Sequence, residues 1–398
     1  MKFIVIWLVL LALLSSCDRS QINTEEKTIE KIGGLIKVDS IQIPFLGTPQ
    51  LHDVDPKNRN VVFMQSGPDE EEVFVANFDG QILHSFDAHG NTMVGFLRLM
   101  APLQFNKEGS RLLAFGVPHI KQISLDGEVV DVLFSGNTAY YSSNPAPNNE
   151  LHVHQGKIFY NNHMNDQEFR WDRADFFKKL RLIGYYDLVE KEKNNFLKFP
   201  DESVYASGRI FPHSDWISHF TFSDEYLHVI FNGEPAVYVY EANTPFTFVK
   251  MIELDLKEFQ FSNGVPEGEQ VADFMETMIT MGKMINIKFH NNMIVVCYSS
   301  GFNAQQMKTW ATAESPQERN EMINRFRSES PPRIQVFDKD YNLLADFPIP
   351  IHINPSGLFE RDGFLWAAKH NPDMEEDFFT IYKLFLEKGG EVAEKNLN

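Results

Sequence analysis

Two histidine-containing stretches have residue types and spacings that could do chemistry. His152 and His154 form an H-x-H pair; side chains two apart on a strand point to one face, so they could supply half of a metal site. The stretch FPHSDWISHF contains His213, Asp215 and His219, which suits metal binding or acid–base work. An exposed edge strand and a loop rich in turn-forming residues explain these patterns as well. We therefore assign no catalytic residue and no metal ligand.

Other chemical motifs are weak or missing. The run PDEEE at 68–72 could offer carboxylates to calcium, but it lacks the spaced D-x-D-x-D-G pattern, which favours a solvated loop. The sequence has no G-x-S-x-G nucleophile elbow, no P-loop and no S-x-D-x-G-x-T-W box of the propeller sialidases. We expect no cofactor, and an enzyme is the less favoured class.

The N-terminal residues predict a lipid anchor at Cys17. Lys2 precedes an apolar run from Phe3 to Leu14, too short for the ~20 residues that cross a bilayer but suited to a secretory signal. The next residues, ending Leu-Ser-Ser-Cys, resemble the bacterial lipobox, which implies acylation and cleavage at Cys17. Residues 1–16 are then a signal peptide, and the polar segment up to 34 is a tether between lipid and domain.

The net charge and the cysteine content limit which molecules can bind the chain and which disulfides it can form. The chain carries a formal charge of −19, and removal of Lys2 with the signal peptide makes it −20, which disfavours nucleic acid. The only other cysteine, Cys297, lies in the apolar run NMIVVCYSSG. We interpret it as a buried small hydrophobic residue that has no partner for an intramolecular disulfide.

A degraded hairpin repeat runs through the rest of the chain. One hairpin, with β-forming residues around a polar turn, recurs six times, at 51–67, 103–116, 151–162, 220–233, 287–301 and 358–371. A second hairpin follows each copy, at 73–86, 120–134, 183–199, 236–254, 333–349 and, as one strand only, 378–390. Four strands per unit, six times over, predict a six-bladed β-propeller of four-stranded antiparallel blades over 35–390, with a disordered tail at 391–398. The segment 35–44 alternates apolar with polar residues, so we expect it to form the outer strand of the last blade and close the ring.

The anchor and hairpins together resemble a family. A lipobox, a short tether and hairpins such as FTFSDEYLHVIF are similar to uncharacterised lipoproteins of Bacteroidota, many assigned six-bladed, TolB-like propellers. The acidic segment NPDMEEDFFTIYKLFL at 371–386 resembles their last strand. The resemblance implies a fold and a cell-envelope location; it carries over no catalytic residue.

The long insertions predict where a ligand binds. They fall at 163–181, 200–216, 257–284 and 302–332, between second and third strands or between blades, positions that share one face of a propeller. Parts of them, such as VADFMETMITM, have helical spacing. Loops on a rigid scaffold often carry function, and aromatic residues and arginine often anchor binding. The candidate binding residues in these insertions are Trp171, Arg209, His213, Trp216, Trp310 and Arg325.

The sequence thus favours a non-catalytic, lipid-anchored envelope protein that binds a protein, peptide or glycan on its insertion-rich face. It leaves open a hydrolase or lyase in the propeller funnel, a purely structural role, and insertions that only pack on each other and cap the channel. It does not decide between inner and outer membrane, or between the periplasmic side and the cell surface.

Overall fold

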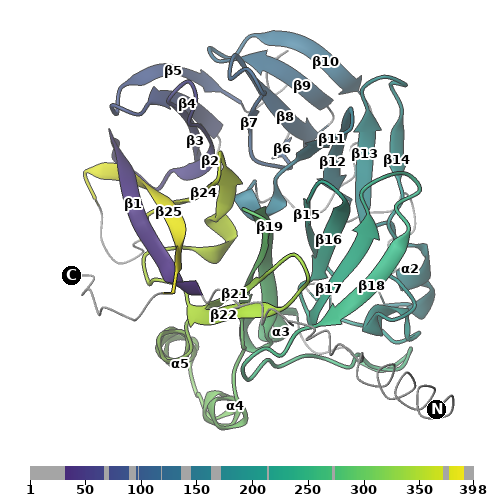
Figure 1. The fold of residues 1–398 in the computed structure, drawn as a ribbon. Helices are drawn as coiled ribbons and strands as arrows, with labels where there is room; N and C mark the ends of the chain where they lie inside the picture. The colour runs from purple at the N-terminus through teal and green to yellow at the C-terminus, as the bar shows by residue number, and fades with distance from the viewer. Residues whose placement is uncertain are drawn as a thin grey trace, which may run out of the picture. The chain divides into compact units, whose positions relative to one another are not determined.

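Six small antiparallel sheets form a ring in the computed structural model of this protein (Figure 1). The structure describes residues 32–66, 71–88, 96, 98–117, 119–135, 145–162, 172–212, 215–270, 274–370 and 376–389. The six-bladed β-propeller predicted from the hairpin repeat is therefore confirmed. Blade two departs from the expected four strands because its inner strand is split into two short pieces that both pair with β8.

The strands of each blade follow one another from the ring axis outward. Blade one contains β2 (Gln50–Asp55), β3 (Asn60–Ser66), β4 (Glu71–Asn77) and β5 (Ile82–Asp87). Blade two contains β6 (Arg98–Leu99), β7 (Gln104–Phe105), β8 (Arg111–Val117), β9 (His119–Ser124) and β10 (Val129–Ser135). Blade three contains β11 (His152–His154), β12 (Lys157–Asn161), β13 (Ile183–Asp187) and β14 (Lys193–Asn195).

The second half of the ring repeats this order. Blade four contains β15 (Ser218–Phe222), β16 (Tyr226–Phe231), β17 (Glu234–Glu241) and β18 (Phe248–Glu253). Blade five contains β19 (Lys283–His290), β20 (Met293–Ser299), β21 (Arg333–Phe337) and β22 (Leu343–Pro348). Blade six contains β23 (Phe359–Arg361), β24 (Phe364–Ala368), β25 (Phe378–Lys388) and, outermost, β1 (Ile32–Pro44).

Strand β1 closes the ring as predicted, because it pairs antiparallel with β25 from Ile32 opposite Lys388 to Pro44 opposite Phe378. The strand begins at Ile32, so the last three residues of the predicted tether belong to the sheet; a register shift after Ile32 accommodates two glycines. The β4–β5 turn of blade one rests on β1. A Cβ atom on Gly80, whose φ is +84°, would lie 2.5 Å from the Gln42 carbonyl oxygen.

Alternation along the strands produces the core. Successive side chains of a strand point to opposite faces, so each blade contributes apolar residues to both neighbours. In β3, Val61 and Phe63 belong to a cluster shared with blade six, whereas Val62 and Met64 belong to one shared with blade two. One such cluster fills each of the six seams between blades. Aromatic residues dominate the seam between blades three and four.

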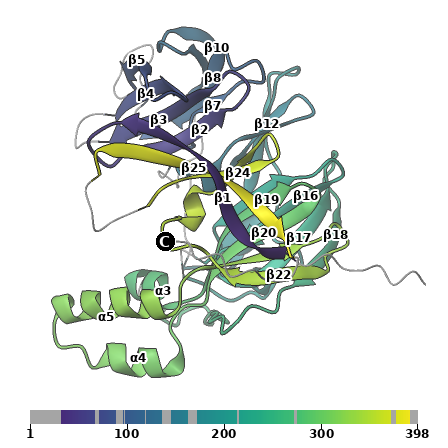
Figure 2. The ribbon, with the colours of Figure 1, turned by 60° about the vertical axis from the view of Figure 1, so that its left-hand side comes forward.

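The helices in the described part of the chain all lie in connections at one end of the ring, which we call the insertion side. They are the 3-10 helices η1 (Pro147–Asn149), η2 (Val204–Ala206) and η3 (Pro355–Gly357) and the α-helices α2 (Ala174–Lys179), α3 (Phe274–Thr280), α4 (Ala304–Ala311) and α5 (Pro316–Glu329). Helix α2 joins β12 to β13, and α4 and α5 join β20 to β21. Figure 2 shows α3, α4 and α5 grouped together below the sheets. The expected helical character of the insertions is confirmed in these helices.

The opposite end of the ring, which we call the turn side, carries the turns between the first and second and between the third and outer strands. The chain enters β1 at Ile32 on this side, at the position that a turn occupies in the other five blades. The long insertions and the start of β1 thus lie at opposite ends of the propeller. Within the described ranges, no helix has the length and apolar character needed to cross a membrane.

Candidate functional site

Trp216 is a core residue of the insertion side. Its side chain is 0% exposed and packs edge-on against Phe176 of α2 at 5.4 Å, inside the cluster that fills the seam between blades three and four. A side chain without exposed surface has no atom with which to touch a ligand. The expectation that Trp216 anchors a ligand therefore needs correction, and the aromatic content of this loop is explained by packing.

Arg209 braces two insertions. Its guanidinium donates to the Gly264 carbonyl oxygen, at 2.9 Å from Nη2 and 3.3 Å from Nε. The neighbouring Ile210 forms a two-residue antiparallel bridge with Val265. The connection between blades three and four is thus joined to the connection between blades four and five. The sequence analysis left open that the insertions pack on each other, and these two insertions do so.

Trp310 and Arg325 belong to a separate hairpin, formed by α4 and α5. Trp310 is 9% exposed and packs with the buried Ile323 and Phe326 of α5, while the Arg319 guanidinium lies over its ring at 5.1 Å. Arg325 is exposed on α5, with its Nε 3.9 Å from a carboxylate oxygen of Glu329. Of the predicted binding residues, Arg325 is the one that the structure places on an open surface.

The remaining predicted residues are placed differently. Cys17, Trp171 and His213 lie outside the described residues. His219 is buried on β15, with Nδ1 2.9 Å from the Asn148 carbonyl oxygen, whereas the backbone carbonyl of Asp215 accepts from Tyr205. The described ranges contain no group of three or more His, Cys, Asp and Glu side chains that could hold a metal ion.

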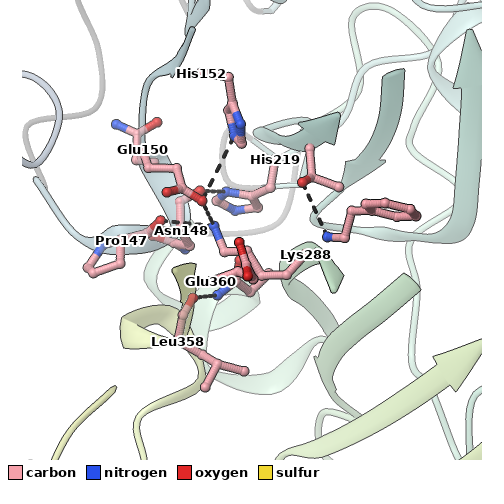
Figure 3. Close-up of polar contacts among 12 residues, drawn as sticks. Pro147, Asn148, Glu150, His152, His219, Lys288, Leu358 and Glu360 are labelled. Atoms are coloured by element: carbon pink, nitrogen blue, oxygen red, sulfur yellow. Dashed lines mark hydrogen bonds and ion pairs between the residues drawn. The ribbon is translucent and has the colours of Figure 1, made fainter. Parts of the chain in front are cut away.

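A polar cluster of buried and half-buried residues occupies the axis of the ring, and every blade contributes to it. Its members lie on the inner strands or directly before them, and we call them the axial cluster: Asp53, Gln104, Glu150, His152, His219, Lys288 and Arg361. Figure 3 shows His152, His219 and Lys288 around Glu150 and the neighbouring η1 backbone. Such a cluster can position a reacting group or join the blades, and its contacts decide between the two.

Glu150 is the centre of this cluster. One oxygen accepts from Lys288 Nζ, and the other accepts from Arg361 Nη1 at 3.1 Å and from Gln104 Nε2 at 3.4 Å. The Nε2 atom of His152 lies 4.0 Å away. These partners come from blades two, three, five and six, so one carboxylate joins four blades.

Arg361 extends the network to blade one. Its Nε donates to Asp53 at 2.7 Å. The other oxygen of Asp53 accepts from the backbone N–H of Phe105 in blade two at 2.9 Å. The two carboxylates of the axial cluster thus face two cations, Lys288 and Arg361. Buried charges need such pairing, because an unpaired one is strongly disfavoured.

Electrostatics makes Glu150 a fixed charge. Burial acts to raise its pKa, but the nearby ammonium of Lys288 and guanidinium of Arg361 outweigh this and lower the pKa to about 2. Burial lowers the pKa values of His152 and His219 to about 4, so both rings are neutral at pH 7. A carboxylate that stays ionised so far below neutral pH is poorly matched to acid–base catalysis at pH 7. The contacts therefore favour a role in joining the blades.

Asp53 behaves differently from Glu150. Its burial raises the pKa to about 6, against the opposing pull of Arg361. Its two oxygens are nevertheless occupied by Arg361 and by backbone N–H groups of Val54 and Phe105. Asp53 therefore also joins blades, because it links Arg361 of blade six to Phe105 of blade two.

The sequence analysis singled out His152 and His219 but did not predict the axial cluster as a group, although a signal for it exists. The first strand of each hairpin pair, or the residue before it, carries polar residues inside an apolar context, as in LHDVD at 51–55, IKFH at 287–290 and LFERD at 358–362. Aligning the six inner strands and asking which polar positions face the axis would have pointed to it. Which acid meets which base depends on the ring geometry, and a single strand does not contain that information.

Comparisons with known proteins agree with this fold. No protein-family model matches the chain, and no curated protein matches it. A crystal structure of a member of the DUF4221 family from Bacteroides vulgatus is similar, with a TM-score of 0.60 and 10% identity over 91% of this chain and all of that one. A protein from Bacteroides fragilis described as exported has a TM-score of 0.51 and 8% identity, over 91% of this chain and 98% of that one. At such identities the likeness shows a shared fold alone. The sequence-based resemblance to Bacteroidota proteins is confirmed at that level.

Proposed function

We propose that this protein is a cell-envelope lipoprotein, anchored through Cys17, whose propeller binds a protein, peptide or glycan on its insertion side. The lipobox and the length of the apolar run support the anchor. The similar fold of an exported Bacteroides protein supports a location outside the cytoplasm. The ion pairs of the axial cluster occupy its carboxylates with cations from other blades, which supports a binding role over acid–base catalysis at the axis.

One observation carries the proposal: the long insertions and the entry into β1 lie at opposite ends of the ring. A random-coil segment as long as the one that separates Cys17 from Ile32 has a root-mean-square length of about 20 Å. On average it keeps the turn side nearest to the membrane. The insertion side then faces away from the membrane, where a large partner can reach it.

Helix α5 supplies the contact chemistry. Helix α5 buries Ile323 and Phe326 against α4 and leaves Arg319, Arg325 and Arg327 exposed. Glu318, Glu321 and Glu329 on the same helix balance the charge of these three arginines, so α5 presents arginine donors on a surface of mixed charge. Arginine combines a planar donor array with apolar contact area, which makes it a common anchor at interfaces.

Site-specific photocrosslinking in the native cell tests the binding face. A photoreactive amino acid replaces Arg325 or Arg327 on α5, or, as matched controls, the exposed Glu128 or Lys191 in turns on the turn side. We expect discrete crosslinked products from the α5 positions and none from the controls. Crosslinks from the turn side alone, or from none of the four positions, would contradict binding on the insertion side.

The anchor is tested separately by Cys17→Ala. Without the acylated thiol, we expect the protein to stay an uncleaved precursor or to fractionate as a soluble protein. A cleaved alanine variant that still fractionates with membranes would show that Cys17 is not the anchor.

A further inference from the structure

A cleft of about 610 Å³ opens on the turn side, in the seam between blades four and five. Its walls are the β15–β16 turn at 223–225 and the β21–β22 turn at 339–341, and its outer edge is Lys250 of β18. The volume is in the range of about 300–1,000 Å³ that is typical of small-molecule sites. We call it the seam cleft; it is separate from the axial cluster and at the opposite end of the ring from the insertions.

Aromatic rings line the seam cleft. The His228 ring is central: it lies parallel to Phe289 at 6.3 Å, tilted to Tyr341 at 5.9 Å and edge-on to Tyr226 at 6.3 Å, all between ring centroids. The three flanking rings are each half-buried, so they present some surface to the cleft. Connected rings of this kind offer apolar, flat contact area.

A buried polar atom at this site lacks a partner. His228 is only 2% exposed, and its Nε2 atom lies 3.1 Å from the hydroxyl of Tyr341. Burial and the nearby Lys250 lower its pKa to about 4, so the ring is neutral at pH 7. Its Nδ1 has no hydrogen-bond partner within the described part of the chain. A buried polar atom without a partner is uncommon.

Free donors and acceptors surround the rings. The carboxylates of Asp224 and Glu225, the ammonium of Lys339 and the amide of Asn292 line the cleft and form no side-chain hydrogen bond or ion pair with another described residue. The Lys250 ammonium lies over the Tyr341 ring at 4.0 Å. Both signs of charge are therefore present, so neither an anion nor a cation finds a uniformly favourable field.

We propose that the seam cleft binds a short neutral oligosaccharide. Sugar hydroxyls both donate and accept, so they can use carboxylates, ammonium groups and an amide at once. The C–H faces of a sugar ring pack well against aromatic rings, and the cleft supplies both kinds of contact side by side. This site is additional to the proposed insertion-side function and does not depend on it.

Binding of labelled oligosaccharides to the purified mature lipoprotein in detergent micelles tests the site. The probes are neutral di- to tetrasaccharides of hexoses and of N-acetylhexosamines, with uronic-acid oligomers, glucosamine oligomers and dipeptides as the other arms. We expect binding of at least one neutral probe. Binding of none of them, or of charged or zwitterionic probes alone, would overturn the assignment.

Variants locate the bound probe. Asp224→Asn and Lys250→Met change exposed side chains, so folding should survive, and each should weaken binding of the neutral probe at least tenfold. Tyr341→Ala should do the same by removing a ring. Glu128→Ala, in a turn of blade two, and Arg325→Ala, on the insertion side, should leave binding unchanged. Equal affinity in wild type, Asp224→Asn and Lys250→Met, with folding retained, would place the sugar elsewhere and overturn the proposal.

Discussion

Glu150 holds more of the ring together than any other single side chain of the axial cluster. It is 6% exposed and accepts from residues of blades two, five and six. In Glu150→Ala, the buried Lys288 and the half-buried Arg361 have one anion fewer between them. Removing one partner of a buried ion pair costs about 3–5 kcal/mol, so we expect a loss of that size in the free energy of unfolding, measured in urea.

The matched control is Glu128→Ala, which removes an exposed carboxylate in a turn and should change stability by no more than about 0.5 kcal/mol. If the two alanine variants unfold at the same urea concentration with the same slope, the axial cluster does not join the blades.

His52 predicts how stability depends on pH. The residue is buried, its Nδ1 accepts from the backbone N–H of Leu103 at 3.2 Å, and burial lowers its pKa to about 3. The unfolded chain protonates this histidine near pH 6.5. Between those pH values the unfolded state binds more protons, so stability that is present above pH 6.5 is lost as the pH falls.

Replacing His52 by Asn removes one titrating group from this balance. Between pH 5.5 and 4, the slope of unfolding free energy against pH should be smaller in His52→Asn than in wild type by about 1.4 kcal/mol per pH unit. Urea titrations at a series of pH values give both slopes. Parallel slopes in the two proteins would mean that His52 is not held neutral in the folded state.

Predictions made for single residues from their type were right in some cases and wrong in others. Cys297 is buried as predicted, and burial raises its pKa to about 12, so the thiol is unreactive. The prediction that Trp216 anchors a ligand was wrong, because the sequence does not distinguish a loop aromatic residue that faces solvent from one that packs under a neighbouring insertion. Asp53 and Arg361 were missed, because their pairing joins residues that lie at opposite ends of the sequence and meet only when the ring closes.

Among the elements, β1 has the largest effect on the integrity of the ring, because it joins the N-terminal part of the chain to the last blade. Ile43 on this strand is 0% exposed and lies in the cluster between blades six and one. Val38 on the same strand is 47% exposed. The two residues give a matched pair of aliphatic truncations on one element.

Ile43→Ala should lower the free energy of unfolding by about 2–5 kcal/mol, because it opens a cavity in a closed seam. Val38→Ala should change it by no more than about 0.5 kcal/mol. Thermal or urea unfolding measures both. If Ile43→Ala is as mild as Val38→Ala, β1 is not an essential part of the sixth blade.

The sequence predicted the strands and hairpins better than it predicted single contacts. Each hairpin carries its own turn residues and its own alternation, so its signal is local, and the last strand and the closing strand share one pattern of apolar residues. The split inner strand of blade two was not predicted. Its two pieces, β6 and β7, have two residues each, which is too short for a periodic signal.

For the molecule as a whole, strand direction was enough to predict that the insertions share one end, because alternate connections of an antiparallel sheet lie at the same edge. What the sequence could not show is how much of that end is used up by packing. Arg209 joins the connection between blades three and four to the one between blades four and five, and Trp216 packs on α2, whereas α5 remains open. The insertion side is therefore part scaffold and part available surface.

The orientation of the anchored ring is measured most directly by fluorescence quenching in vesicles that carry a quencher on the lipid headgroups. A fluorophore is attached to Glu128→Cys on the turn side or to Arg327→Cys on α5 of the lipidated protein; the buried Cys297 leaves the introduced thiol as the reactive one. We predict markedly stronger quenching at position 128 than at position 327. Equal quenching, or stronger quenching at 327, would contradict a propeller that presents its insertion side away from the membrane.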